Sequence, residues 1–366
     1  MRPARGITTA ALVVGMTALL AFVAVAVDVA LLSCCRTEAR AAADAAALAG
    51  AAELWDRSLL PSHLQGQGLP APTSSISTRT VAERQMSHCV DRVCRVAAQN
   101  TVGGQPVTLS QEDLSFASLA GGSALSVQCS FTQQRGNPVR RVIGQTLGLS
   151  DADLLIQSQA VLDQRVAGFA ASTTANAPVI PIVIRDGTWN SQVATSAIVT
   201  IQLTADGSQS TGDAKLCLLQ SPTATVVVDH LASAPNTVVN QIQSGIRKAD
   251  VASLPGQMIA LSSTTGRPLE LAAAPVSRYV LGEVNNALQS IVGRPRVWML
   301  TAVIGNTNES AGYQVSSFVA AKVLACAMDG DRLTVVLAPC PYATSTAIVH
   351  PNQLRNPWLA KVCLVQ

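Results

Sequence analysis

The sequence is poor in aromatic and in charged residues. Aromatic residues make up 3% of the 366 residues and charged residues 13%, whereas about a quarter of the residues in a typical soluble domain are charged. The volume of any hydrophobic core must therefore come from Leu, Val, Ile and Ala. The net charge of +3 is small and scattered, and no basic stripe with interleaved aromatic residues occurs. Nucleic-acid binding thus has no electrostatic basis in this sequence.

Signatures of catalysis and of metal binding are scarce as well. No G-x-S-x-G, H-E-x-x-H or phosphate-binding loop is present, and the nine cysteines show no C-x-x-C spacing. The four histidines are dispersed along the chain, at His63, His88, His230 and His350. We therefore assign no catalytic, cofactor-binding or metal-binding residues, expect no cofactor, and expect a protein that is not an enzyme.

A long hydrophobic run dominates the N-terminus. It extends from Ile7 to Leu32 and is interrupted only by Asp28. A helix needs about 20 apolar residues to cross a hydrocarbon core of about 30 Å, and the run is too long for the apolar region of a secretory signal. It predicts a transmembrane helix over residues 7–32.

An alanine-rich stretch continues this helix to residue 55. Alanine has the highest helix propensity, so residues 33–55 predict a helical extension, and at about 1.5 Å per residue the whole rod is roughly 70 Å long. Half of it would lie in lipid and half would project. Arg2 and Arg5 favour a cytoplasmic location for residues 1–6. We expect a single-pass protein of the cell membrane with the bulk of the chain outside the cytoplasm.

The same block carries a family resemblance. The segments Ala26-Val27-Asp28-Val29, Arg36-Thr37-Glu38 and Ala42 to Ala51 resemble the N-terminal segment of TadG-like proteins, which belong to the TadE/TadG group of the Tad system that builds Flp-type pili. Between the last two segments the family usually shows a Leu-Gln-Asn-like triplet, where this chain has Ala39-Arg40-Ala41. The resemblance implies a structural component of pilus assembly or surface attachment.

The resemblance also suggests a role for the single charge in the run. It implies that the N-terminal helix contacts other pilus-assembly or envelope proteins, and that Asp28 is one point of contact within the membrane. The alternative is that Asp28 is an interfacial residue that ends the span, where the cost of a charge falls. The sequence favours neither.

The sequence disfavours two processing events at the N-terminus, lipidation at a cysteine and prepilin-type cleavage. Leu31-Leu32-Ser33-Cys34 resembles a lipoprotein cleavage box, but Asp28 stands only six positions before the cysteine and the apolar run is unusually long. Gly6 could invite prepilin-type cleavage, but Ala11 stands where that site requires a glutamate.

The remaining chain divides into a linker and two units. Frequent Pro, Gly and Ser residues without a hydrophobic period predict a linker over residues 56–79. Residues 80–168 predict a small α+β domain and residues 178–366 a larger, β-rich α+β domain. Helices are predicted over 80–99, 138–147, 236–248 and 276–291, and strands over 125–131, 154–162, 179–184, 198–203, 216–219, 225–228, 297–304, 317–328 and 333–337.

One pattern offers a rival function. Asp206, Ser208 and Ser210 match the D-x-S-x-S pattern of metal-dependent adhesion sites, in which a hard cation takes carboxylate and hydroxyl oxygens. An apolar strand, rather than the required helix, follows, which favours a polar hairpin loop. A cation-dependent adhesion module and a membrane-tethered exported enzyme are kept as alternatives.

The cysteines are informative if the chain is exported from the cytoplasm. Cys34 and Cys35 stand just after the apolar run, where the chain would leave the membrane, and seven more follow at Cys89, Cys94, Cys129, Cys217, Cys326, Cys340 and Cys363. In an exported chain, scattered cysteines predict structural disulfides; buried free thiols are the alternative. Cys89 and Cys94 are not expected to pair, because five residues on a helix turn the side chains apart.

Overall fold

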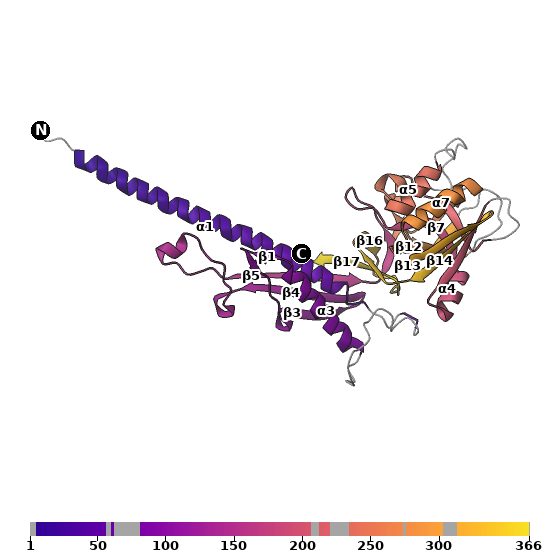
Figure 1. Ribbon diagram of the computed structural model, residues 1–366, viewed down its shortest axis with the longest axis horizontal. Helices are drawn as coiled ribbons and strands as arrows, with labels where there is room; N and C mark the ends of the chain where they lie inside the picture. The colour runs from indigo at the N-terminus through magenta and orange to yellow at the C-terminus, as the bar shows by residue number, and fades with distance from the viewer. Residues whose placement is uncertain are drawn as a thin grey trace.

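The computed structural model describes residues 5–55, 60–61, 81–205, 212–219, 234–273, 276–302 and 313–365. A long helix, α1, leads from the N-terminus into a first sheet unit, and a second sheet unit with its own helices lies beyond the end of α1 (Figure 1). A long apolar helix followed by mixed helices and sheets confirms the predicted α+β class.

Helix α1 spans Arg5–Ala51 and changes character along its length. The apolar side chains between Leu12 and Val29 are largely exposed, and α1 is the one described helix long and apolar enough to cross a membrane. Farther along, seven residues at spacings of one, three and four are almost fully buried: Cys35, Ala39, Ala42, Ala43, Ala46, Ala47 and Ala51. Such spacing marks one face of a helix. The second half of α1 is therefore a core helix of the first unit, and not the projecting rod that the sequence suggested.

The first unit packs one sheet against α1 and α3. Helix α3 (Val81–Ala98) lies beside α1, and both complete a core with the sheet. The strand order is β15-β17-β5-β4-β3, antiparallel except for the parallel pair β15 and β17. The strands are β3 (Leu114–Leu119), β4 (Gly122–Phe131), β5 (Leu154–Asp163), β15 (Tyr342–Thr344) and β17 (Leu359–Val365). A short hairpin of β1 (Thr101–Val102) and β2 (Gln105–Pro106) follows α3.

The second unit is built on a seven-stranded mixed sheet. Its order is β11-β9-β7-β12-β13-β14-β8, and β7 and β12 form a parallel pair. The strands are β7 (Val179–Arg185), β8 (Val199–Thr204), β9 (Ala214–Leu218), β11 (Leu269–Ala273), β12 (Pro295–Thr301), β13 (Tyr313–Asp329) and β14 (Arg332–Pro339). The long strand β13 also pairs with β11. The aliphatic side chains of this second unit form the larger of the hydrophobic cores.

Helices cover both faces of this sheet. Figure 1 shows α5 (Ala234–Ser244) and α7 (Arg278–Ser290) together on one side and α4 (Asp186–Thr195) on the other. A one-turn helix, α6 (Ser262–Thr265), adjoins a small sheet of β10 (Ile259–Ala260), β6 (Val166–Phe169) and β16 (Ala347–Val349).

The end of the chain joins the two units. Strand β17 pairs with β5 along residues 159–163, so residues 80–168 and the 178–366 segment share a sheet. Trp55, which follows α1, packs with Leu162 and Ala360 and donates its indole N–H to the Pro357 carbonyl at 3.1 Å. The last strand thus ties the α1 unit to the β-rich unit.

Most of the predicted elements lie close to observed ones, but several observed strands, among them β3, β11 and β17, were not predicted, and three helical segments differ. The helix predicted over 138–147 is only a 3-10 turn, η4 (Gly144–Leu147), because the main-chain N–H groups of Val142, Ile143 and Gly144 donate to the Asp28 carboxylate instead of to a helix. Helix α1 ends at Ala51, before residue 55. Helix α4 was not predicted; its Gly, Thr and Asn residues have low helix propensity, and burial of Trp189 and Val193 stabilises it. The strand predicted over 225–228 lies outside the described residues.

The disulfide prediction is not confirmed, because all nine cysteines are free thiols in the structure. Cys89 lies on α3 and Cys129 on β4 within the first core, whereas Cys217 lies in the second. Burial, with the charge of Glu53, raises the pKa of Cys89 to about 12. Burial, with the charge of Asp113, raises the pKa of Cys129 to about 11.

These pKa values predict the order of thiol labelling. The thiolate is the reactive form, so Cys89 and Cys129 will resist alkylation of the folded chain at neutral pH in the presence of reductant. The exposed Cys34 will be modified first. Peptide mass mapping after timed alkylation measures the order. Modification of Cys89 as fast as Cys34 would contradict its place in the core.

Candidate functional site: helix α1 and the segment docked on it

Asp28 lies under a cluster of backbone donors. Its carboxylate accepts hydrogen bonds from the N–H groups of Val142 at 3.0 Å, Ile143 at 3.1 Å and Gly144 at 2.6 Å. Three successive N–H groups form an anion-binding concavity, and only 7% of Asp28 is exposed. The charge that interrupts the apolar run is therefore bound by the chain itself, an arrangement that neither reading of the sequence anticipated.

The donors belong to the connection between β4 and β5. We call residues 132–153 the docking segment. Asp151 stabilises its interior. One carboxylate oxygen accepts hydrogen bonds from the main-chain N–H of Arg141 at 3.3 Å and from the Gln145 side-chain amide at 2.8 Å. The main chain pairs Val139 with Ala152. The docking segment is thus an internally hydrogen-bonded unit that presents its N–H groups to α1.

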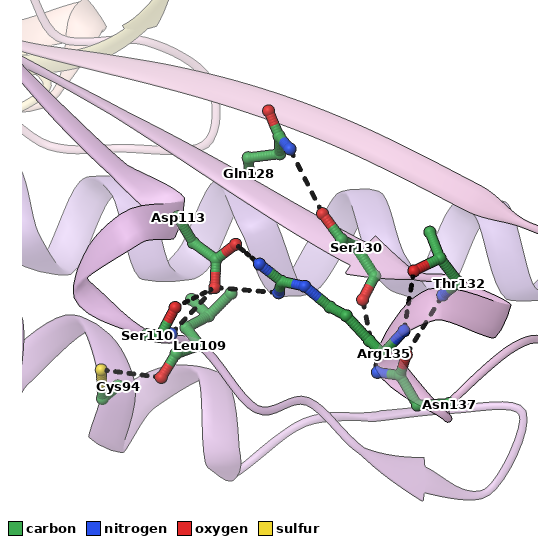
Figure 2. A network of polar contacts seen from close by, with 9 residues as sticks. All are labelled: Cys94, Leu109, Ser110, Asp113, Gln128, Ser130, Thr132, Arg135 and Asn137. Carbon is green, nitrogen blue, oxygen red and sulfur yellow. Dashed lines mark hydrogen bonds and ion pairs between the residues drawn. The ribbon is translucent and has the colours of Figure 1, made fainter.

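A partly buried ion pair fixes the base of the docking segment (Figure 2). Arg135 binds the Asp113 carboxylate through both terminal nitrogens, at 3.0 and 2.6 Å, and Asp113 also accepts from the Ser110 N–H at 2.8 Å. Asn137 accepts from the Thr132 N–H at 3.1 Å. The 3-10 turns η2 (Gln111–Asp113) and η3 (Gln133–Arg135) that carry this pair are thereby joined.

This pair predicts a pH-dependent loss of stability. Burial alone would raise the pKa of Asp113, but the hydrogen bonds from Arg135 and Ser110 outweigh it and lower the pKa. A lowered folded-state pKa contributes stability above the unfolded value of about 3.9 that is lost as the pH falls through the folded value. Arg135→Ala should cost about 2–3 kcal/mol at neutral pH, because it leaves a carboxylate that is 1% exposed without its partner.

The matched variants separate charge from packing. In Arg135→Ala the pKa of Asp113 should rise. The difference in stability between wild type and this variant should therefore shrink as the pH is lowered and the carboxyl becomes protonated. Adding Asp113→Asn should recover part of the loss at neutral pH. Hydrogen exchange of β4 amides over a pH series measures both effects. A deficit that does not change with pH would rule out the uncompensated charge as its cause.

Two more acidic residues of α1 bind the first unit. Glu38 accepts from the Gly103 N–H at 2.8 Å, in the β1–β2 turn, where Gly103 has a φ of +56° that disfavours other residues. Asp44 accepts from the Ser158 hydroxyl at 2.5 Å and pairs with Arg40 at 3.2 Å. Asp28, Glu38 and Asp44 therefore bind three different parts of the unit to the helix.

Close approach to the sheet depends on the absence of a side chain at Gly50. A Cβ at this position would lie 2.3 Å from both Leu125 Cδ2 and Val93 Cγ2. The Cys89 thiol donates to the Gly50 carbonyl at 3.2 Å. At Gly50, therefore, α1, α3 and β4 approach one another closely.

The other residues singled out in the sequence do not gather into a site. Asp206, Ser208 and Ser210 lie outside the described residues. Cys34 is exposed on an unbroken α1. Within the described ranges, no three Asp, Glu, His or Cys side chains are close enough together to hold a metal ion.

The residues that the sequence did not reveal are the donors to Asp28. Val142, Ile143 and Gly144 act through their main chain, more than a hundred positions from their acceptor. Backbone donors leave no side-chain signature. Gly144 is the one partial signal, because a Cβ there would lie 2.8 Å from Asp28 Oδ2.

Comparison with known proteins gives a family for this helix. The family described as putative Flp pilus-assembly TadE/G-like matches residues 6–53, which corresponds to α1 and the residues just after it. No curated protein and no solved structure gives a match to the chain. The matched range includes Asp28, Glu38, Asp44 and Gly50, the residues of α1 that bind or approach the first unit. The resemblance seen in the sequence is confirmed for the N-terminal helix: residues 6–53 are similar to the TadE/G-like Flp pilus-assembly family.

Proposed function

We propose that this protein is a membrane-anchored structural component of a Tad/Flp-type pilus assembly or surface-attachment system. The observation that carries the proposal is the division of α1 into an exposed apolar half and a half buried in the first unit, within a helix that matches the pilus-assembly family. One continuous helix couples a folded unit to the bilayer without a flexible joint. The role is structural and not enzymatic.

The proposed topology follows from the same helix. The N-terminus lies in the cytoplasm, and the two sheet units lie outside it. The lipid-exposed half of α1 is the surface that contacts other pilus-assembly or envelope proteins. A reporter active only outside the cytoplasm, fused after Gln366, should be active, and the chain should stay with membranes in alkaline carbonate. Release by carbonate would refute the spanning anchor, since charge disruption does not extract a spanning helix.

Deletion of the gene in the native host tests the function. We expect Flp pili, counted by electron microscopy, and surface attachment to be lost, and both to return when the full chain is supplied. A chain whose residues 7–27 are replaced by an unrelated apolar helix of equal length separates anchoring from lateral contact. Normal pili and normal attachment in the deletion strain would overturn the proposal.

A further inference from the structure

We propose that the docking segment is a second membrane contact, which lies on the outer surface of the lipid bilayer and binds phospholipid head groups beside α1. The inference rests on the proposed spanning role of α1. It adds a lipid-binding surface, formed by Val142, Leu149, Arg140 and Arg141, to a chain in which only the helix was expected to touch the membrane.

The depth of the docking segment follows from its contacts. The apolar run between Ile7 and Val27 is about 30 Å long at 1.5 Å per residue, the thickness of the hydrocarbon core. Asp28 is therefore at the outer boundary of that core. Because Val142, Ile143 and Gly144 bind the Asp28 carboxylate directly, the segment is fixed at the level of the head groups.

The burial of α1 indicates that the docking segment covers the helix for one turn beyond Asp28, toward the hydrocarbon core. Ala24 and Asp28, one turn apart on the same face, are each 7% exposed, whereas Val25 and Val27 between them are 55% and 42% exposed. The turn η4 contacts α1. Figure 1 shows the connection before β5 reaching along α1 toward its N-terminal half, past the strands of the sheet.

The side chains of the docking segment suit an interface between lipid and water. Val142 is 62% exposed and Leu149 is 47% exposed, so no described part of the chain covers them, although the segment that carries them is internally hydrogen-bonded. Beside them, Arg140 is exposed. Apolar side chains that enter the boundary between head groups and acyl chains, next to basic residues, are typical of interfacial membrane binding.

Arg141 places a second basic group at the same depth. The residue is partly exposed, and the Asp28 carboxylate is near enough to interact with it electrostatically. A partly exposed arginine at head-group depth suits the oxygens of a phosphate, which guanidinium groups bind well. The phosphodiester of a phospholipid is the group available at that depth.

Quenching by brominated lipid tests the contact in the full chain. The protein is reconstituted into vesicles of phosphatidylcholine and phosphatidylglycerol, with or without bromine on the acyl chains. Val142→Trp should lose roughly half of the emission of the added indole with brominated lipid, because an interfacial side chain enters about 5–10 Å into the head-group boundary. Tyr279→Trp, at a 70% exposed position on α7 of the second unit, is the matched control and should lose none.

The outcomes separate this inference from the proposed function. Flotation of the wild-type chain with vesicles after carbonate washing reports on α1 alone. If the chain floats and Val142→Trp is quenched no more than Tyr279→Trp, the lipid-binding surface is refuted while the anchor stands. If Arg140→Gln combined with Arg141→Gln reduces the quenching in vesicles that contain phosphatidylglycerol, the arginines bind the head groups. Unchanged quenching would remove them from the site.

Discussion

Gly50→Val should unfold the first unit locally while leaving α1 in the membrane. The new side chain would have to occupy space held by Leu125 and Val93, whose methyl carbons lie 2.3 Å from the position of a Cβ. Both are fully buried, so neither can swing away into solvent. Overpacking of this kind costs about 1–3 kcal/mol per insertion and occasionally more, and we expect about 3 kcal/mol for valine. Hydrogen exchange of α3 and β4 amides measures the loss.

Smaller changes at glycines of the same helix sharpen this prediction. Gly50→Ala gains about 1 kcal/mol of helix propensity, but the overlap with Leu125 and Val93 should outweigh the gain. Gly15→Ala is the matched control, because no atom lies within 4 Å of a Cβ there, and it should be neutral or slightly stabilising. If Gly50→Ala were as harmless as Gly15→Ala, the packing of α1 against β4 would differ from the structure.

The sequence was most informative where the signal is local and repeated. Apolar length and alanine content predicted α1 almost to its end, since these properties act within a few residues. Alternation predicted β4 from Leu125 to Phe131, although the strand begins earlier, at Gly122. Long-range pairing was out of reach: nothing near Leu359–Val365 indicates that β17 returns to pair with β5.

Helix α4 illustrates a second limit. The sequence Asp186-Gly187-Thr188-Trp189-Asn190 has low helix propensity, and it still forms a helix because Trp189 is buried against the sheet and meets Trp358 edge to face at 6.0 Å. Tertiary packing of one large side chain outweighs the local preference. Trp358 is 169 positions away, so the sequence alone could not supply this contact.

The role of Asp28 could be stated from the sequence only as a choice between a partner contact and the end of the span. Asp28 is the single charge in an apolar run, which marks its position as unusual. The third possibility, an intramolecular bond to backbone N–H groups, requires knowing that the docking segment folds back onto α1. The structure thereby changes what a defect at Asp28 would mean.

Asp28→Ala should release the docking segment from α1. Three backbone donors lose their acceptor at once, and hydrogen bonds to a charged acceptor are among the strong ones. We expect exchange of the Val142, Ile143 and Gly144 amides to accelerate on the order of tenfold or more, while insertion of the more apolar helix is unchanged or improved. Asp28→Asn keeps one acceptor oxygen and should give an intermediate effect.

Gly144→Ala breaks the same contact from the other side, because its Cβ would lie 2.8 Å from Asp28 Oδ2. Gly282→Ala, where no atom lies within 4 Å, is the control for a glycine change. If docking is the role of Asp28, Asp28→Ala and Gly144→Ala should reduce pilus assembly alike, and the double variant should be no worse than either, since the two changes remove one interaction. If Asp28 instead binds a partner within the membrane, Asp28→Ala alone should reduce assembly. Equal exchange rates in wild type and Asp28→Ala would show that the carboxylate does not hold the docking segment.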